Sequence, residues 1–480
     1  MATPLRVEFT NQNKTYGADQ MWITMFVDPA PTPNVCFGGT SEKVSFTGPL
    51  NNSPCYQITD KKLAEGIDVY SATSLRFYVS LGNPMDTKAF VAGSTFFGAP
   101  TFTNPSDPNW NVRWDIFELT VSNPRSPDDL GDLSTINGYG IPMMIDTFPL
   151  PKPGASGKGQ TTARSYAEGS APYSNLELLM KTYGGYNNLG GVPATGIVTN
   201  GNNFLRLIGP PNGAFSPTLA TGGPFPSLNF YLDKVLKNGV KTPIKDAGRI
   251  SGHTWDLTAS AAGTLTPKPA AKQMTLTGKI DGKDFDMTVD ADSNVGQANA
   301  MYTFSSMVYQ APGTGSQNPG LHFKYDGKVI TEADLITELD KNDKGHNHGK
   351  KALAEIYHDL FSAYCFGLVG NPNKVTGWTN SDYGNKSLND MGSAGWVALA
   401  GDIGAGKVLL ANVPLFSEKT GKGYGYHNDW AALLYASSNS VYGFAYSDFF
   451  QFPIGQHTYK TPKGDMVNSW RVTVLADPPM

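Results

Sequence analysis

The first third of the chain alternates apolar and polar residues with the two-residue period of β-strands. Three segments show this pattern, namely Leu5–Asn11 (LRVEFTN), Met21–Asp28 (MWITMFVD) and Ser74–Gly82 (SLRFYVSLG). Stretches rich in Pro, Gly and Asn separate them, and these residues favour turns. Because neighbouring side chains of a strand point to opposite faces, the pattern predicts sheets with one apolar face. We therefore expect residues 1–150 to form a β domain.

The middle of the chain contains segments with the three- and four-residue spacing of amphipathic helices. The strongest is Lys351–Gly367, and two shorter candidates are Ser174–Tyr183 and Ser227–Asn238. Thr331 followed by Asp334 has the form of a capping box at the start of another helix.

Strand patterns return between residues 248 and 310, where Asp281 and Gly282 predict a hairpin turn. The Pro-, Gly- and Ser-rich stretch Pro149–Gly159 is typical of a linker or a long surface loop. Together these patterns predict a mainly β fold with an α+β second lobe.

Composition narrows the classes of function. Of 480 residues, 16% are charged and the net charge is −4, which provides no basic surface for nucleic acid or an anionic membrane. No segment reaches the length of a membrane-spanning helix. Aromatic residues make up 11% of the chain, and Gly (53) and Pro (34) are frequent. We expect a monomer without nucleic-acid or membrane partners. The N-terminus shows no signal peptide, so we expect a secreted protein whose leader has been removed. The alternative is a protein that is not exported by that route, including a cytoplasmic one.

Cysteines and histidines predict little chemistry. Cys36, Cys55 and Cys365 permit at most one intramolecular disulfide, and Cys36 and Cys55 could close one loop. His346 and His348 form a His-x-His pair without a Cys or acidic partner at metal-binding spacing, so a solvated loop is favoured. We predict neither a metal nor an organic cofactor.

Candidate chemistry concentrates between Asn104 and Met144. The segment WDIFELT (114–120) places Glu118 in an aromatic and β-branched strand pattern, and LSTINGYGIPM (133–143) follows about fifteen residues later. Two facing strands that each offer a polar group suit glycoside hydrolysis, in which an acid and a base flank the scissile bond.

This segment resembles the catalytic segment of the β-1,3-glucanases of glycoside hydrolase family 64, which are related to thaumatin-like proteins. The resemblance implies a thaumatin-like β-sandwich or barrel of residues 1–150, completed by residues 430–480. It also implies a mixed α/β lobe of residues 151–429 with an inserted β-rich segment at about 250–310. A wide groove between the two would hold a β-1,3-glucan chain.

The resemblance gives Glu118 the role of general acid in an inverting mechanism, because it matches the Glu of the W-x-x-x-E-x-T motif. The base is an Asp of the next strand, and its position is occupied here by Asn137. An amide can orient a water molecule but has little affinity for its proton. Three interpretations stay open: an Asp-to-Asn variant that traps substrate, a natural sequence that uses another base, or a glucan-binding relative that has lost hydrolysis.

Nearby carboxylates fit the base position poorly. Asp132 lies five residues before Asn137 and Asp146 nine after it, and these odd offsets place both on the opposite face of a regular strand. Asp128 and Asp129 belong to a loop that could fold over the cleft.

A second resemblance to the family lies at Tyr442–Asp448 (YGFAYSD), a segment that is beside the groove in that family. Asp448 could bind sugar hydroxyls or act as an alternative base, and it could equally cap a turn. Asn428 matches an Asn in the same family segment, which implies a sugar contact.

Further residues are candidates for substrate binding. Thr120 lies two residues after Glu118 and therefore shares its face. Aromatic rings can stack on sugar faces, although most aromatic residues of a β domain are core. The rings nearest to the motifs are Trp110, Trp114, Tyr139, Tyr424 and Tyr426.

The sequence thus predicts an endo-β-1,3-glucanase-like hydrolase whose base position holds Asn137. The alternatives are a lectin-like β-glucan-binding protein and a related hydrolase that acts on a different glycan.

Overall fold

The computed structural model describes residues 3–27, 32–46, 54–87, 100, 102, 104–127, 129–133, 138–148, 160–164, 196–208, 232, 236, 241–245, 250, 252–263, 272–290, 321–343, 348–365 and 466–477. Within these ranges, side chains are not described at 160–164, 242, 243, 245, 342, 358, 359 and 361–365. Most of their regular structure is β-strand, arranged in several sheets, which confirms the predicted β-rich fold.

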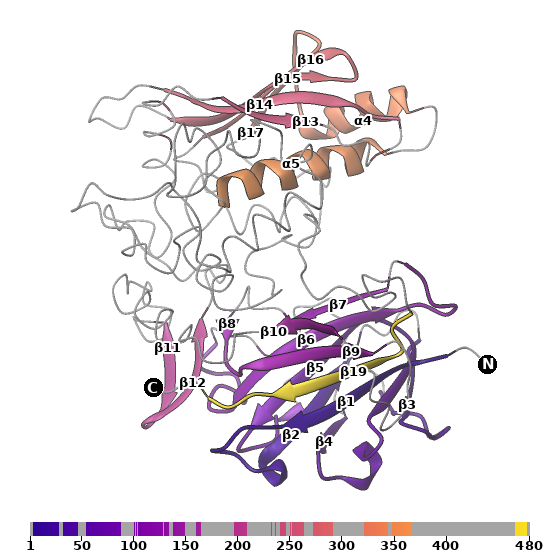
Figure 1. Cartoon of the computed structure of the whole chain (residues 1–480). Coiled ribbons are helices and arrows are strands. Elements are labelled where there is room, and N and C mark those ends of the chain that lie inside the picture. Colours follow the sequence, from indigo (N-terminus) through magenta and orange to yellow (C-terminus); the bar gives the residue numbers. More distant parts are fainter. Residues whose placement is uncertain are drawn as a thin grey trace.

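The largest sheet has ten strands and is built mainly from the N-terminal third of the chain (Figure 1). Its path runs β10-β9-β19-β1-β5-β2-β4, while β3 and β6 also pair with β5, and β7 pairs with β6. The strands are β1 (Leu5–Asn11), β2 (Met21–Phe26), β3 (Asn34–Phe37), β4 (Cys55–Gln57), β5 (Ile67–Leu81), β6 (Arg113–Val121), β7 (Leu130–Leu133), β9 (Met143–Phe148), β10 (Gln160–Arg164) and β19 (Ser469–Val474). Two single 3-10 turns, η1 (Ala18–Gln20) and η2 (Lys61–Leu63), connect strands of this sheet.

Strand β5 belongs to both halves of this sheet. Its first part pairs with β1 and β3, and its second part pairs with β2 and β6. The register against β6 shifts between Ala72 and Leu75, where Ser74 has a φ of 49°. Irregularities of this kind bend a strand and increase its twist. The bend lets the two halves of the sheet face each other.

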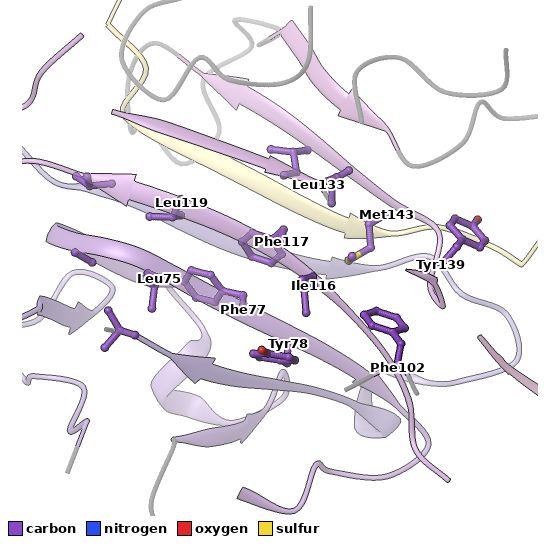
Figure 2. Packing of buried hydrophobic residues seen from close by; sticks show 14 of the residues in the cluster. Leu75, Phe77, Tyr78, Phe102, Ile116, Phe117, Leu119, Leu133, Tyr139 and Met143 are labelled. Carbon is purple, nitrogen blue, oxygen red and sulfur yellow. The ribbon is translucent and has the colours of Figure 1, made fainter. Parts of the chain in front are cut away.

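Apolar rings fill the space between the two halves. Phe77 of β5 and Phe117 of β6 stack (Figure 2), and their ring centroids are 4.6 Å apart. The ring centroid of Phe9, in β1, lies 5.8 Å from that of Phe77. Trp470 of β19 is fully buried and packs against Gly131 of β7, where a Cβ atom would come within 2.3 Å of the indole ring. The alternation seen in the sequence therefore separates a buried apolar face from a more polar face.

The C-terminal strand β19 lies between β1 and β9. It runs parallel to β1 and antiparallel to β9, so residues near the two ends of the chain form one ladder. Arg113, at the start of β6, binds Asp477 in the segment after β19. Its two terminal guanidinium nitrogens donate to the two carboxylate oxygens of Asp477 at 3.0 and 2.5 Å. The family-like segment Tyr442–Asp448 lies outside the described residues.

A six-stranded antiparallel sheet follows later in the sequence. Its order is β13-β14-β15-β16-β17-β18, with β13 (Thr242–Lys245), β14 (Trp255–Ala262), β15 (Gln273–Ile280), β16 (Lys283–Asp290), β17 (Leu321–Tyr325) and β18 (Lys328–Ile330). The predicted Asp281-Gly282 hairpin is confirmed, because it joins β15 to β16 with φ of 53° and 77°. A three-stranded sheet combines β11 (Ile197–Asn200), β12 (Asn203–Ile208) and β8 (Gly138–Tyr139).

Two helices accompany the six-stranded sheet (Figure 1). Helix α4 (Glu332–Asn342) starts as its sequence predicts, since Thr331 Oγ1 accepts a hydrogen bond of 3.1 Å from the backbone N–H of Asp334. Helix α5 (Gly349–Cys365) matches the strongest predicted helix. The predicted helix at residues 174–183 and the linker at 149–159 lie outside the described residues, and of residues 227–238 only 232 and 236 are described, both helical.

Cys36 and Cys55 are both free thiols, so the disulfide considered between them is absent. Cys36 is in β3, which pairs with β5, whereas Cys55 is in β4, which pairs with β2. Burial raises the pKa of the Cys55 thiol, which makes it a weak nucleophile. No helix among the described residues is long and apolar enough to cross a membrane.

The ring stack between the two halves of the large sheet predicts a large effect of truncation. Phe117→Ala should lower the free energy of unfolding by about 3–5 kcal/mol, because it leaves a cavity beside Phe77 and Phe9. Val329→Ala is the control, since Val329 is 81% exposed and its loss should change stability by less than about 0.5 kcal/mol. Urea denaturation measures both, and equal effects of the two substitutions would contradict the assignment of this core.

Candidate active site

Strand β6 separates the core of the large sheet from the candidate site. Phe117 and Leu119 point into the core and are fully buried. Glu118 and Thr120 point to the opposite face, because side chains alternate along a strand. The Glu118 side chain is 26% exposed. The predicted acid therefore lies on a strand whose other face is held by packed rings.

Three charged residues form one row across neighbouring strands. Arg76 of β5 is paired in register with Glu118 of β6, and Glu118 with Asp132 of β7. Directly opposite residues of antiparallel strands share a face, with Cβ atoms about 4.5–5.5 Å apart. The Nε of Arg76 donates to Oε2 of Glu118 at 2.9 Å. We call Arg76, Glu118 and Asp132 the charged row.

The environment of Arg76 keeps its guanidinium charged. Burial works against the charge, but attraction to Glu118 and Tyr78 and hydrogen bonds to both residues raise the pKa of Arg76 above its ordinary value. Burial also raises the pKa of Tyr78 to about 12, so its hydroxyl is neutral. The row thus contains one permanent positive charge beside two carboxyl groups.

Asp132 lies near the end of β7. Residues 134–137 are outside the described ranges, so the expectation that Asp132 and Asn137 lie on opposite faces stays a prediction. Asp132 is 8% exposed and is in register with Glu118. The sequence contains a signal for this pairing. The segment 122–127 (SNPRSP) is rich in turn-forming residues, and Glu118 and Asp132 lie seven residues before and seven residues after Arg125, so a hairpin centred there would place them opposite each other.

The connection between β6 and β7 is fixed by a buried ion pair. Nε of Arg125 lies 2.5 Å from a carboxylate oxygen of Asp129, and the other oxygen accepts the N–H of Ser122 at 2.7 Å. Arg125 also donates to the backbone carbonyl of Val467 at 3.2 Å. The Asp129 side chain is fully buried, so the expectation that it could fold over a cleft is wrong. Asp128 lies outside the described residues.

Thr120 fastens β6 to the bend of β5. Its Oγ1 accepts the backbone N–H of Ser74 at 3.0 Å, at the residue with positive φ. Thr120 is half-buried on the same face as Glu118. This contact gives Thr120 a structural role, and a contact with sugar stays a prediction.

Two of the aromatic residues suggested as sugar platforms belong to the core. Trp114 and Tyr139 are each only 1% exposed, which leaves no open ring face for stacking. Trp110 is half-buried, and the guanidinium of Arg206 lies 5.0 Å from its ring centroid and 5.4 Å from that of Trp114. Burial lowers the pKa of Arg206 to about 10. Of the three rings, Trp110 alone keeps surface that a sugar could contact.

Arg206 positions the chain that enters β6. Its guanidinium donates to the carbonyl of Val112 at 2.9 Å and also to the carbonyl of Trp110. No pattern in the sequence points to Arg206, because it lies far from the motif along the chain and is brought close by the pairing of β12 with β8.

Asp115 fixes the segment that follows Asn137. Its fully buried carboxylate accepts the N–H groups of Gly140 at 2.8 Å and Ile141 at 3.0 Å, and also the N–H of Ile116 at 2.8 Å. Nε of Arg113 donates to the carbonyl of Gly140 at 2.9 Å. A Cβ atom at residue 140 would lie 2.3 Å from the Trp114 carbonyl oxygen, so only glycine fits there.

Several predicted site residues lie outside the described ranges, namely Asn137, Asn428, Tyr424, Tyr426 and Asp448. Among the described side chains, no group of three His, Cys, Asp or Glu residues could hold a metal ion. His348 pairs with Asp343 at 3.2 Å, whereas His346 is not described.

Comparisons with known proteins return the family that the motif resembles, at low similarity. No protein-family model matches the sequence, and no curated protein does. Solved structures that match include a β-1,3-glucanase domain of glycoside hydrolase family 64 from Clostridium beijerinckii, with 14% identity, a TM-score of 0.48 and coverage of 99% of this chain and 98% of that chain. Another is a laminaripentaose-producing β-1,3-glucanase in complex with laminaritetraose, with 13% identity, a TM-score of 0.47 and coverage of 99% of both chains. A family 64 enzyme from Paenibacillus barengoltzii matches over 43% of this chain and 48% of its own, with 20% identity and a TM-score of 0.31. At these values the likeness alone assigns no activity.

The burial of Asp115 predicts a pH-dependent stability. Burial raises the pKa of Asp115 from 3.8 to about 6, against the effects of the three N–H groups and of Arg113. Between these pH values the folded protein keeps a proton that the unfolded chain releases, so this contribution to stability falls as the pH rises from about 4 to 6. A difference of about two pH units corresponds to about 3 kcal/mol at most.

The measurement is urea denaturation of the wild type and Asp115→Asn at pH 4, 5, 6 and 7. The wild type should lose stability relative to the variant across this interval and then level off. A difference between the two proteins that stays constant with pH would contradict the prediction.

Proposed function

We propose that this protein is a glycoside hydrolase that cleaves β-1,3-glucan, with Glu118 as the general acid. The observation that carries the proposal is the placement of Glu118 in the charged row, on the face of β6 opposite the core. This is the Glu of the W-x-x-x-E-x-T motif, and a second carboxyl group, Asp132, lies directly across from it. Glycoside hydrolysis uses a pair of carboxyl groups that flank the scissile bond.

Arg76 supports an acid role for Glu118 in the transition state. When the acid gives its proton to the glycosidic oxygen, it becomes an anion, and the guanidinium 2.9 Å away stabilises that anion. The same contact fixes the position of the Glu118 carboxyl group within the charged row.

The reaction breaks the bond between the anomeric carbon and the glycosidic oxygen and forms a bond from that carbon to water. In an inverting mechanism the water attacks from the face opposite the leaving group, while a base removes its proton.

The proposal also covers the architecture and location of the protein. It includes the thaumatin-like fold, the division into domains at residues 150 and 430, the groove between two lobes, secretion, and action as a monomer. It requires no cofactor. Asn428, Tyr424, Tyr426 and Trp110 are proposed to bind the glucan.

A second candidate is a lectin-like β-glucan-binding protein. The amide of Asn137, at the position where the resembled family has its base, favours this function. Such a protein would bind laminarin and release no reducing sugar. A hydrolase for another glycan would show neither activity on laminarin nor strong binding to it.

The first test of function compares the wild type with Glu118→Gln on laminarin. The wild type should release reducing ends, and Glu118→Gln should be slower by at least about 100-fold, because general acid catalysis contributes factors of this size. Asp286→Asn, an exposed carboxylate on β16, is the matched control and should keep full activity. Affinity electrophoresis in laminarin gels separates the alternatives, since retarded but inactive wild type identifies a binding protein.

Replacement of Arg76 tests the balance of charge in the row. Arg76→Gln should lower kcat on laminarin by about 10–100-fold, because the anion formed on Glu118 loses its stabilising partner. Arg76→Lys should recover part of this loss, since it keeps the charge but not the geometry of the guanidinium. An unchanged kcat in Arg76→Gln that retains its fold by circular dichroism would refute the role of Arg76.

A further inference from the structure

We infer that Arg206 is a positioning residue of the glucan-binding surface, which holds the Trp110 ring as a platform for a sugar residue away from the bond that is cleaved. This inference rests on the proposed function and deepens it, because it names the side chain that makes Trp110 a fixed binding surface. It implies that the protein binds long glucan chains better than short ones.

Arg206 and the two indole rings that it contacts lie on the face of the sheet that carries Glu118. Trp114 precedes Glu118 by four residues of β6, and this even offset directs both side chains to the same face. The guanidinium carbon of Arg206 lies 5.4 Å from the ring centroid of Trp114 and 5.0 Å from that of Trp110. Trp110 is therefore joined through Arg206 to the face on which hydrolysis is proposed.

Burial decreases from Trp114 to Trp110. Trp114 is 1% exposed, and Phe102 packs against it with ring centroids 4.4 Å apart. Arg206 is fully buried, whereas Trp110 is half-buried and keeps solvent-accessible surface. The exposed part of an aromatic ring offers the flat apolar surface on which the face of a sugar ring can stack.

The backbone that carries Trp110 is fixed from two sides. Arg206 donates to the carbonyl oxygens of Trp110 and Val112, the latter at 2.9 Å. The buried side chain of Asn109 accepts the N–H of Asp86 at 2.7 Å and donates to the carbonyl of Asp86 at 3.1 Å. A binding residue that is held in place before its ligand arrives loses less conformational entropy on binding.

The charge of Arg206 is costly to bury. Burial lowers the pKa of Arg206 to about 10, against the attraction of Asp107 and Asp115, so the side chain stays charged at neutral pH. An apolar residue of similar size could fill the same volume without this cost. A guanidinium, however, can donate to two backbone carbonyls and stack on an aromatic ring at the same time. The fixed position of Trp110 is therefore what Arg206 adds beyond the filling of space.

Trp110 lies at a distance from the reacting bond. Four residues of a strand span about 13 Å, which separates the level of Trp114 on the sheet from that of Glu118. A short substrate with its scissile bond at Glu118 ends before it reaches Trp110, whereas a long glucan chain extends over both. Loss of the platform should therefore weaken the binding of long chains selectively.

The test compares a long substrate, laminarin, with a short one, dinitrophenyl laminaribioside. Trp110→Ala should raise KM for laminarin about 5–10-fold and leave kcat within about twofold, because the platform binds the ground state and the transition state equally. The kcat/KM of this variant on the short substrate should stay within about twofold of the wild type. Trp110→Phe keeps an aromatic ring and should recover most of the loss on laminarin.

Replacement of Arg206 tests its positioning role. Arg206→Gln should raise KM for laminarin as much as Trp110→Ala does, and the double variant should show no further increase, because both changes remove one platform. Arg206→Lys should recover part of the loss, since it keeps the charge but not the fork of the guanidinium. A merely structural role would lower activity on both substrates equally. Thermal unfolding shows which variants are folded, and if Arg206→Gln is not, Arg206→Lys and the two Trp110 variants decide.

The matched control is a second arginine that lies over an aromatic ring. The guanidinium carbon of Arg471 is 4.9 Å from the ring centroid of Phe148, which is half-buried in β9 in the other half of the large sheet. Arg471→Gln and Phe148→Ala should keep KM for laminarin within about twofold of the wild type. Equal increases of KM in both pairs would contradict the inference.

The outcomes separate the inference from the proposed function. If the wild type hydrolyses laminarin while folded Trp110→Ala keeps its KM, or loses activity on both substrates equally, the function stands and the inference is wrong. Wild type that hydrolyses neither substrate overturns hydrolysis, and affinity electrophoresis in laminarin gels then decides the inference. Weaker retardation of Trp110→Ala and Arg206→Gln than of the wild type supports it, equal retardation overturns it, and a wild type that is not retarded overturns both.

Discussion

The cross-strand register of β5, β6 and β7 is the constraint on which the candidate site depends. It pairs Arg76 with Glu118 and Glu118 with Asp132, and a slip of one residue would turn these side chains into the core. What prevents a slip is the other face of the same strands, where Phe77 and Phe117 stack at 4.6 Å. Apolar packing on one face therefore fixes the polar geometry on the other.

Buried polar contacts hold the ends of these strands. Arg125 and Asp129 close the connection from β6 to β7, while Asp115 and Arg113 tie the start of β6 to the chain around Gly140. Arg113 also binds Asp477, near the C-terminus. A buried ion pair often adds little to net stability, but its specific geometry can select one arrangement of the chain. Here each pair fixes a segment next to Glu118 or Asn137.

The local patterns of the sequence predicted the elements well, because they depend on neighbouring residues. The alternation over Leu5–Asn11 became β1, the capping residue Thr331 begins α4, and Asp281 forms the hairpin turn. Each of these features results from contacts within a few positions of the chain. The strand-forming pattern around Glu118 likewise placed that residue on the face opposite the core.

The sequence could not show contacts that join distant segments. Arg76 precedes Glu118 by 42 residues, and Arg206 follows Trp110 by 96, so neither pattern nor spacing indicates that they touch. Trp114 and Tyr139 were predicted as sugar platforms because they lie near the motif, but both are buried. Trp114 packs against Phe102 and Tyr78, and Tyr139 pairs with Leu207 of β12. Likewise, the register of β6 against β7 shows that Asp132 lies beside Glu118.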